Sequence, residues 1–568
     1  ISIGLVGSEM CIRDRLRPDG SSFKVFNVDP LVEGLAASDV ELGYDGNLYF
    51  ADYGGGWSVN RNGTVQVLRP TDDNARTNGA ETARMFKKGF SHRSVAELES
   101  LLDSADQRVR QEAQFALVEK GEKALPTLIG LIEEQDDFAL SSLHALWALG
   151  QLFRNGFEEA SGPILSALQS EHPELRANAA RVAGDVGIGE ARDLLISALE
   201  DTSSRVVSLS AIGLGRLCAA GDREAENALM DAVEKNQGPD FEVGLRHSFL
   251  SALARISTAE SLSEIPASDS YERRLMAVLV LRRLQHQDLS LYLEDSHDLV
   301  RHEAIRAVYD TPALKTPAGS KLMSLDLADL PGYLQLRVLG AGFRSQSAAG
   351  ARLLIRAAAN LDLAEDARFF ALRGLERWSN PPQFDAVLGD YRPLVASNVD
   401  LTAVSGSVRM DYLNFLAKEN NPKLTSLGTD VAKILGIELD PDLLRQQATD
   451  GELASSVRIS CMMTLASLGL EEDDSLFLSL LEDETDEVRA LALKVGFERN
   501  LDGMEDLALK AVDQGTLPVA REAIRQLGET LPDKLIEFWE NRELQLRSEL
   551  WLLSLIHISE PTRPIDIS

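Results

Sequence analysis

Arginine recurs along this 568-residue chain in a fixed local pattern, in which an apolar residue usually precedes the arginine and a small or apolar residue follows three positions later. The first example is Val109-Arg110-Gln111-Glu112-Ala113. A guanidinium group binds a carboxylate or a phosphate through two parallel hydrogen bonds. One function that these recurring arginines could have is therefore the recognition of an acidic peptide or of phosphate. Its members are Arg110, Arg176, Arg246, Arg274, Arg301, Arg337, Arg368, Arg409, Arg458, Arg489 and Arg521.

A structural role for these arginines is the alternative, and we favour it. Each arginine would lie near the start of a helix and pair with an acidic residue or a helix-end carbonyl in the adjoining repeat. Recurrence at the same place in every repeat supports such a ladder, because a binding site would be confined to a few repeats.

Histidines at 297 and 302, with His286 upstream, are the other candidates for site chemistry. Residues five apart on a helix do not share a face, and no neighbour completes a metal-ligand set. The chain has no HExxH, CxxC, GxSxG, Walker A or complete GxGxxG motif, and the glycines from Gly184 to Gly189 read as a helix corner. The sequence therefore predicts no catalytic, cofactor-binding or metal-binding residue.

The spacing of the arginines predicts the elements that carry them. Successive arginines lie about 31 residues apart, and Ser141 and Ser208 stand where the pattern skips a step. A period in this range indicates stacked helical hairpins, which bury a continuous core between neighbours. We expect a mostly α fold, with an α-solenoid of about fourteen hairpins over residues 93–552. The wider spacing across residues 395–453 predicts an insertion or a longer repeat there.

The first hairpin illustrates the pattern. Asp106 is a good N-cap, and Val109, Ala113 and Leu117 form an apolar stripe at helical spacing. Gly121 breaks this helix, and a second apolar helix follows from about residue 124. The third hairpin repeats the plan from Pro173.

Composition narrows the classes of partner. The net charge is −32 at pH 7, which disfavours binding to nucleic acid and to anionic membranes. No run of 18 apolar residues is present, so nothing in the sequence predicts a membrane span. Cys218 and Cys461 lie in apolar helical segments and read as small buried residues. We expect a protein partner on the solenoid surface.

The region before the hairpins has a different pattern. Short runs at 23–28, 39–42, 48–51 and 64–68, separated by Asp-Gly and Asn-Gly turns, predict a four-stranded antiparallel meander within residues 16–70. Such a meander is the repeating unit of a β-propeller. Residues 71–92 are polar and lack periodicity, so we expect a linker.

A longer motif carries a family resemblance. Asp39-Val-Glu-Leu-Gly-Tyr-Asp-Gly-Asn-Leu-Tyr-Phe-Ala-Asp-Tyr-Gly-Gly-Gly-Trp57 resembles the last blade of glucose/sorbosone-dehydrogenase-type propellers, which are exported enzymes. In a bacterial subgroup of that family, helical HEAT-type repeats and a c-type haem domain follow the propeller. The resemblance implies a periplasmic or exported parent that uses pyrroloquinoline quinone (PQQ) and haem c. Ala36 and Ser38 replace two arginines that often bind the quinone in that family, and no CxxCH motif is present, so no cofactor is expected within this chain.

The hairpins carry a second resemblance. The pattern Asp-x-x-Val-Arg-x-x-Ala-x-x-Ala-Leu is similar to the short HEAT-like repeats that also occur in phycobilisome lyases. A lyase function would require a bilin-binding groove, for which the sequence has no signal.

Both ends resemble translated sequencing adaptor. Residues 5–15 and 553–563 are what one transposase adaptor encodes on its two strands. We therefore expect residues 1–15 and 553–568 to be disordered artefacts, and residues 16–552 to be an internal fragment of a longer protein.

The leading hypothesis is a fragment of an exported propeller–HEAT–haem c dehydrogenase-like protein, in which the solenoid is a protein-interaction scaffold or spacer without a catalytic site. The alternative is a non-catalytic HEAT-repeat scaffold that binds protein. Whether the parent is an enzyme is left open.

Overall fold

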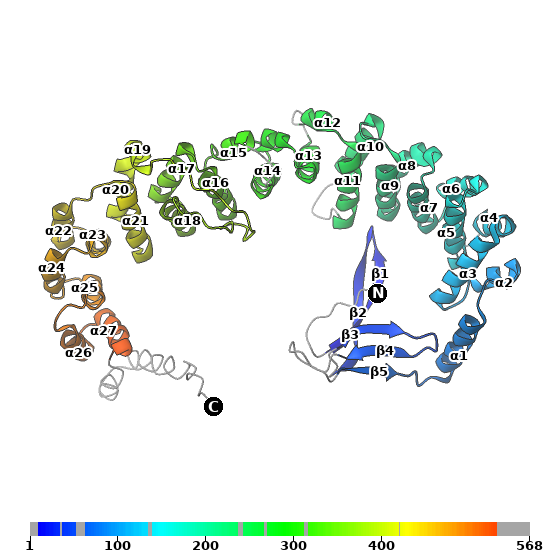
Figure 1. Ribbon diagram of the computed structural model, residues 1–568, viewed down its shortest axis with the longest axis horizontal. Helices are drawn as coiled ribbons and strands as arrows, with labels where there is room; N and C mark the ends of the chain where they lie inside the picture. The colour runs from blue at the N-terminus through cyan, green and yellow to red at the C-terminus, as the bar shows by residue number, and fades with distance from the viewer. Residues whose placement is uncertain are drawn as a thin grey trace. The chain divides into compact units, whose positions relative to one another are not determined.

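The computed structural model describes residues 10–33, 37–52, 63–133, 139–236, 242–265, 268, 270–311, 316–419 and 421–530. The chain divides into two compact units, residues 1–303 and 304–568, and each is described by itself. Helices build most of both units (Figure 1). The predicted fold class, a mostly α solenoid, is confirmed.

The helices of the first unit alternate between two rows, here called row A and row B (Figure 1). Row A contains α3 (Gln107–Lys120), α5 (Leu140–Arg154), α7 (Pro173–Val186), α9 (Ser204–Leu217), α11 (Val243–Ile256) and α13 (Tyr271–Leu284). Row B contains α2 (Val95–Leu101), α4 (Leu125–Glu133), α6 (Ser161–Ala167), α8 (Arg192–Ser197), α10 (Arg223–Lys235) and α12 (Ala259–Ser263). Helix α14 (Asp298–Asp310) follows, and the division between the units falls within it.

The second unit repeats this arrangement. Row A contains α16 (Gly332–Ser345), α18 (Glu365–Glu376), α21 (Pro422–Ile434), α23 (Ser455–Leu468), α25 (Asp486–Glu498) and α27 (Leu517–Thr530). Row B contains α15 (Thr316–Leu322), α17 (Ala348–Ala359), α19 (Leu401–Ser405), α20 (Arg409–Lys418), α22 (Pro441–Thr449), α24 (Asp474–Leu480) and α26 (Met504–Gln514).

Local sequence signals start and end these helices as predicted. The Asp106 carboxylate accepts a hydrogen bond from the backbone N–H of Arg108 and caps α3. Val109, Ala113 and Leu117 are buried, and Gly121, with φ of +61°, ends the helix. These features position the helix by satisfying its terminal groups and burying one face.

Glycine allows the row A helices of the first unit to approach one another closely. A Cβ atom built on Gly184 of α7 would lie 2.6 Å from the Cα atom of Gly213 in α9. A Cβ atom on Gly215 would lie 2.8 Å from the Cα atom of Ala252 in α11. Real Cβ atoms do not approach backbone this closely, so any larger residue would push the helices apart.

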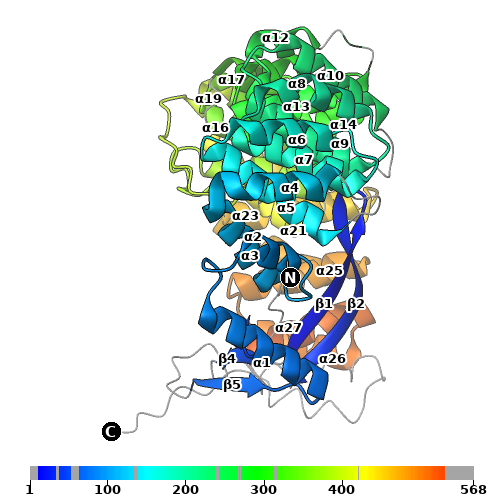
Figure 2. The same cartoon turned by 90° about the vertical axis from the view of Figure 1, so that its right-hand side faces the viewer.

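The strands form two separate sheets in place of the predicted four-stranded meander. β1 (Met10–Asp19) pairs with β2 (Ser22–Glu33) as one antiparallel ribbon (Figure 2). β3 (Ala37–Leu42), β4 (Leu48–Asp52) and β5 (Thr64–Leu68) form a three-stranded antiparallel sheet. The run at 23–28 lies in β2, because β1 offers it a longer antiparallel partner than β3 does.

Helix α1 (Asp73–Lys88) occupies most of the segment that was expected to be a linker. Asp72 caps its N-terminus through a hydrogen bond to the backbone N–H of Ala75. Its apolar contact is small: the ring of Phe86 stacks on Tyr44 of the β3–β4 turn with centroids 4.0 Å apart. So few apolar residues produce no visible periodicity, which is why the sequence failed to predict this helix.

The structure describes part of the first expected adaptor segment and none of the second. The backbone of Met10–Arg15 lies in β1, in contrast to the disorder expected there, while the side chains of this stretch lie outside the described residues. Residues 531–568 also lie outside them, so burial of Met10 or Ile556, which would count against an adaptor origin, stays untested.

The close contact between α7 and α9 leads to a prediction about stability. Replacing Gly184 with Ala should lower the free energy of unfolding by about 1–3 kcal/mol, because the methyl group has no space beside Gly213. Gly162 in α6 is the matched control, since a Cβ atom there meets nothing within 4 Å. Gly162→Ala should be neutral or stabilising by up to about 1 kcal/mol. Urea unfolding followed by circular dichroism measures both, and equal effects of the two substitutions would contradict the packing argument.

Candidate functional site

Most of the recurring arginines share one structural position, the fourth residue of a row A helix or of α14, here called the ladder position. It holds Arg110, Arg176, Arg246, Arg274, Arg301, Arg368, Arg458 and Arg489. Arg274, Arg368 and Arg458 are buried. A buried guanidinium group must be paired to remain charged, so its partners define what the position does.

One partner is the loop that leads into the same helix. Arg176 donates from Nη1 to the carbonyl of Ser170 at 2.7 Å, and Arg274 makes the same bond to Ser268 at 2.7 Å. Arg110 bonds the carbonyl of Ser104 at 2.5 Å. In each case the acceptor lies six residues before the arginine. The side chain therefore ties the helix to its own approach loop.

The second partner is a carboxylate in the loop of the following repeat. Arg176 holds Asp201 by two bonds, of 2.7 and 2.9 Å, and Arg274 holds Asp295 by bonds of 2.8 and 3.1 Å. Arg458 contacts Asp483 in the same way. Each arginine thus joins two successive repeats.

The paired carboxylates also organise the loops that contain them. Asp201 accepts a hydrogen bond from the backbone N–H of Ser203 at 2.8 Å, and Asp483 accepts one from Thr485 at 2.9 Å. Burial would raise the pKa of Asp201, but the hydrogen bonds from Arg176 and Ser203 outweigh it and lower the pKa below its usual value. The same balance lowers the pKa of Asp483. Both groups are therefore held in the charged form.

The remaining arginines at the ladder position have other combinations of partners. Arg368 contacts the buried Glu419, whose carboxylate accepts the backbone N–H of Asn421. Arg301 bonds Asp298 at 2.7 Å within its own helix, and Arg489 bonds the carbonyl of Asp483 at 2.5 Å. Arg246 occupies the position in α11.

Three predicted members lie elsewhere. Arg337 is the sixth residue of α16 and pairs with Asp310, which precedes it in the sequence, at 2.9 Å. The ladder position of α16 is held by the buried Gln335, which donates to the carbonyl of Leu330 at 2.9 Å. Arg409 is exposed at the start of α20, in row B, and Arg521 is exposed as the fifth residue of α27.

Residues without a positive charge fill the ladder position in four more row A helices, one of which is α27 with Ala520. Thr425 occupies it in α21 and donates to the carbonyl of Glu419, six residues earlier, at 3.3 Å. Leu143 and Val207 occupy it in α5 and α9, so Ser141 and Ser208 are displaced from the expected place. Sequence spacing alone misses such substitutions, because neither Thr nor an apolar residue resembles Arg.

His144 of α5 is a ladder contact that sequence reasoning missed. Arg110 donates from Nε to His144 Nε2 at 3.3 Å, and the Nδ1 atom lies 2.8 Å from Gln114 Oε1. Burial, and then the positive charge of Arg110, lower the pKa of His144 to about 4. The imidazole is therefore neutral near pH 7 and accepts the bond from arginine.

The other candidate residues have ordinary contacts. His297 stacks on Tyr271 with ring centroids 3.9 Å apart. Trp147 donates from its indole to Asn178 at 3.2 Å. No group of three or more metal-binding side chains occurs in the described part of the chain, and none of its helices is long and apolar enough to cross a bilayer.

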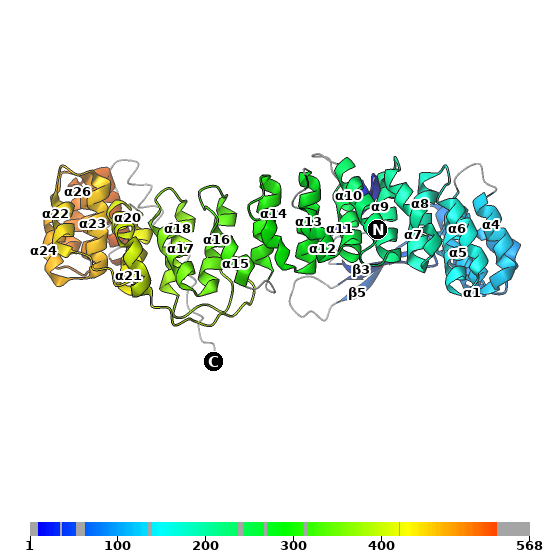
Figure 3. The same ribbon diagram turned by 90° about the horizontal axis from the view of Figure 1, so that it is seen from above.

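The regular repeat is interrupted between α18 and α19 by residues 379–400, here called the strap. The strap runs past α16 and α18 along one edge of the second unit (Figure 3). The backbone N–H of Ser397 donates to Gln346 at the end of α16, and Arg344 of α16 donates to the carbonyl of Arg392 at 3.1 Å. The expected irregularity at 395–453 thus begins earlier, and residues 437–440 form a loop between α21 and α22.

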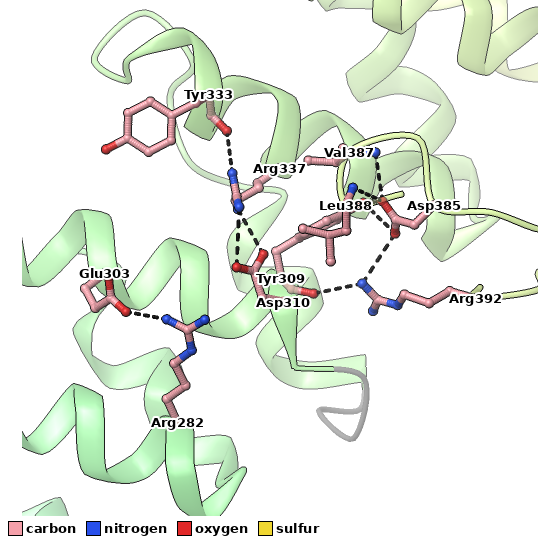
Figure 4. Close-up of polar contacts among 10 residues, drawn as sticks. All are labelled: Arg282, Glu303, Tyr309, Asp310, Tyr333, Arg337, Asp385, Val387, Leu388 and Arg392. Atoms are coloured by element: carbon pink, nitrogen blue, oxygen red, sulfur yellow. Dashed lines mark hydrogen bonds and ion pairs between the residues drawn. The ribbon is translucent and has the colours of Figure 1, made fainter. Parts of the chain in front are cut away.

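Asp385 anchors the strap to α14 and α16 (Figure 4). Its side chain is buried and accepts a bond from Tyr309 Oη at 2.9 Å. Arg392 and Arg344 lie 3.3 and 3.5 Å from its Oδ2 atom. Burial, followed by the charge of Asp385, raises the pKa of Tyr309 well above its usual value, so the hydroxyl stays protonated and donates. Figure 4 also shows the Arg337–Asp310 pair and, in the first unit, Arg282 bonded to Glu303 at 2.6 Å.

The strap forms a short hairpin around Asp385, here called the strap hairpin and comprising residues 383–392. Phe384 and Tyr391 form an antiparallel bridge, and Gly389, with φ of +76°, allows the turn between them. The two rings contact each other edge to face at 5.7 Å and are 59% and 64% exposed. Asp385 and Arg392 point inward while the aromatic pair points outward. The contacts of Asp385 and Arg392 thus fix the hairpin in a conformation that leaves Phe384 and Tyr391 exposed to solvent.

Comparison with known proteins supports the fold. Residues 160–246 match the family model of HEAT repeats. The fold is a HEAT-like α-solenoid. Similar solved structures are the complex of Kap95 with Nup1 (14% identity, TM-score 0.36, covering 85% of this chain and 75% of that chain) and yeast importin-beta Kap95p (14%, 0.33, 86% and 68%). Another is the CpcE–CpcF complex of phycocyanin lyase from Nostoc (21%, 0.21, 51% and 90%). A search of curated proteins finds no match.

The ladder predicts a localised loss of stability. Replacing Arg176 with Met should lower the free energy of unfolding by about 1.5–3 kcal/mol, because the carboxylate of Asp201 loses its two charged hydrogen bonds. Arg352 is exposed on α17 of row B and is the matched control. Arg352→Met should change stability by less than about 0.5 kcal/mol. Denaturant unfolding measures both, and indistinguishable curves would show that the ladder contact contributes nothing.

The lowered pKa of Asp201 predicts how this contribution depends on pH. A carboxyl group with a depressed pKa stabilises the fold above its unfolded value of about 3.9, and the stabilisation disappears as pH falls through the folded pKa. Asp201→Asn should therefore be least stable relative to the wild type near neutral pH, and the difference should shrink below about pH 4. Thermal unfolding across this range tests the idea. A difference that is constant with pH would mean that the charge of Asp201 is irrelevant.

Proposed function

We propose that this chain is a protein-binding scaffold and that the strap hairpin is one of its contact surfaces. The observation that carries the proposal is the outward aromatic pair, Phe384 and Tyr391, fixed by the buried Asp385. Aromatic side chains supply a large share of the binding energy in protein interfaces. The helical rows provide the rigid surface from which the pair projects.

The strap hairpin has the properties of a preorganised contact. Its backbone is fixed by hydrogen bonds from Asp385 N–H to the carbonyl of Asp390 and from Arg392 N–H to the carbonyl of Gln383. A contact residue that is already ordered loses less conformational entropy on binding. Val395, further along the strap, is a second exposed apolar residue of this segment, with 88% of its surface exposed.

A purely structural role explains the strap less well. Irregular segments longer than about 12–15 residues inside compact folds are usually functional or disordered, and this one is ordered by a buried charge cluster. The outward rings add little to the core, because both are more than half exposed.

The exported dehydrogenase-like parent is the second candidate. It is supported by the three-stranded antiparallel sheet β3–β5 and by the Asp45 turn, where the carboxylate accepts bonds from Asn47 and Tyr49. PQQ, haem c and a periplasmic location would follow from this parentage and would involve protein outside this chain. Recovery of the flanking genomic sequence tests it. Further blades and a downstream CxxCH would support this candidate, whereas a reading frame without them would leave the scaffold alone.

The contact proposal predicts selective loss of a partner. We expect the double variant Phe384→Ser/Tyr391→Ser to lose a set of proteins that the full-length wild-type chain enriches from extracts of its source organism, as measured by quantitative mass spectrometry. Val243→Ser/Met410→Ser is the matched control, because these side chains are 79% and 75% exposed elsewhere. It should retain the set. Equal enrichment by both variants, with unchanged thermal unfolding, would refute the strap hairpin as a contact surface.

A further inference from the structure

Four exposed arginines form a positive cluster in the first unit, outside the ladder. They are Arg154 on α5, Arg181 on α7, Arg216 on α9 and Arg255 on α11. The four helices are consecutive members of row A and pack side by side. Such a concentration of positive charge is unexpected in a chain whose net charge is −32.

One carboxylate, Asp185 of α7, lies among these arginines. Arg216 contacts its Oδ1 atom, and Arg181 lies 3.6 Å from its Oδ2 atom. Arg154 donates to the backbone carbonyl of the same residue at 3.4 Å. Arg255 makes no ion pair with any residue that the structure describes. Two of the four arginines therefore share one carboxylate, and the other two make no ion pair with it.

The cluster is electrostatically strained. Partial burial, and then the positive charges of Arg181 and Arg255, lower the pKa of Arg216. The Arg181 side chain nevertheless remains 59% exposed and that of Arg216 39% exposed. An added anion would relieve this repulsion and can reach the guanidinium groups from solvent.

The helix dipole accounts for only part of the arrangement. Arg154, Arg216 and Arg255 lie in the last turns of their helices, where cations interact favourably with the C-terminal end of the dipole. Arg181 lies in the second half of α7 but more than one turn from its end at Val186, where the dipole effect is weak.

We propose that this arginine cluster binds an extended acidic segment of a partner protein. Adjacent packed helices lie about 8–10 Å apart, so the cluster spans roughly 25–30 Å. An extended chain rises about 3.3 Å per residue. A segment of about ten residues, with an acidic residue at the first position and at every third position after it, therefore places one carboxylate near each of the four helices. The inference names a partner chemistry for the scaffold and rests on the proposed function only in requiring a protein partner.

A protein segment fits this surface better than a nucleic acid. A long phosphate backbone would carry charge beyond the cluster onto a protein that is negatively charged overall. A short acidic segment presents its charge only where the arginines lie.

The test measures binding of a fluorescein-labelled peptide, four repeats of Glu-Ser-Gly, to the full chain by fluorescence anisotropy. The wild type should bind it, with an affinity that falls as salt rises, and should not bind the same peptide with Gln in place of Glu. Arg181→Gln/Arg216→Gln should weaken binding at least about tenfold. Arg352→Gln/Arg356→Gln on α17 is the control and should not change it.

Asp185 separates a binding role from a structural one. Asp185→Asn removes the competing carboxylate, so it should tighten peptide binding about threefold or more even if the fold becomes less stable. A structural cluster would instead lose stability without gaining affinity. Phe384→Ser/Tyr391→Ser should bind the peptide as the wild type does, which keeps this test independent of the strap hairpin.

Three results would overturn the proposal. The first is absence of peptide binding by the wild type. The second is binding that the Arg181→Gln/Arg216→Gln variant retains. The third is equal or tighter binding of a single-stranded deoxythymidine oligonucleotide that the same variant loses, since the cluster would then be a general polyanion site.

Discussion

The guanidinium group at the ladder position is the interaction on which this fold depends. A helical repeat must satisfy the polar groups of the loop that enters it, and it must also bind its neighbour strongly enough to share a core. One arginine does both when it bonds the carbonyl of its own loop and the carboxylate of the next. Arg176, which joins Ser170 to Asp201, shows the full arrangement. Apolar packing alone would not specify this register, because one alanine-rich helix face resembles another.

The same chemistry reappears where the repeat is broken. In the strap, Asp385 is the counterpart of the ladder carboxylate: it pairs with Arg344 and Arg392 and accepts a hydrogen bond from the hydroxyl of Tyr309. A buried carboxylate with these partners remains paired even without a second helix beside it. An irregular segment can therefore replace a helix without leaving buried charge unsatisfied. Its outer face is then free to carry aromatic residues that a packed helix would have to bury.

The sequence predicted the features whose causes are local. Asp106 as an N-cap, Gly121 as a helix end and Pro173 at a first turn depend only on neighbouring residues, and all three were confirmed. The assignment of Arg409 to a row A helix was wrong, because its local pattern matches and only tertiary packing places α20 in row B. The helix at 73–88 was missed because it has too few apolar residues to give a visible periodicity, and its aromatic contact, Phe86 on Tyr44, is with a distant part of the sequence. His144 was missed because it enters the ladder through space, and Thr425 was missed because threonine at the ladder position does not resemble arginine.

The proposed acidic-segment site depends on the same packing that closes the core. Gly184 and Gly213 bring α7 and α9 to a separation at which Arg216 of α9 contacts Asp185, which Arg181 already contacts within α7. A larger residue at either glycine would separate the helices and divide the cluster. The glycine contacts on the buried side of row A thus determine how far apart the arginines on its exposed side lie. Because the ladder holds the helices near their N-terminal ends and the glycines and core residues hold their buried faces, only exposed residues such as Arg181 and Arg216 can vary to suit a partner without loss of the fold.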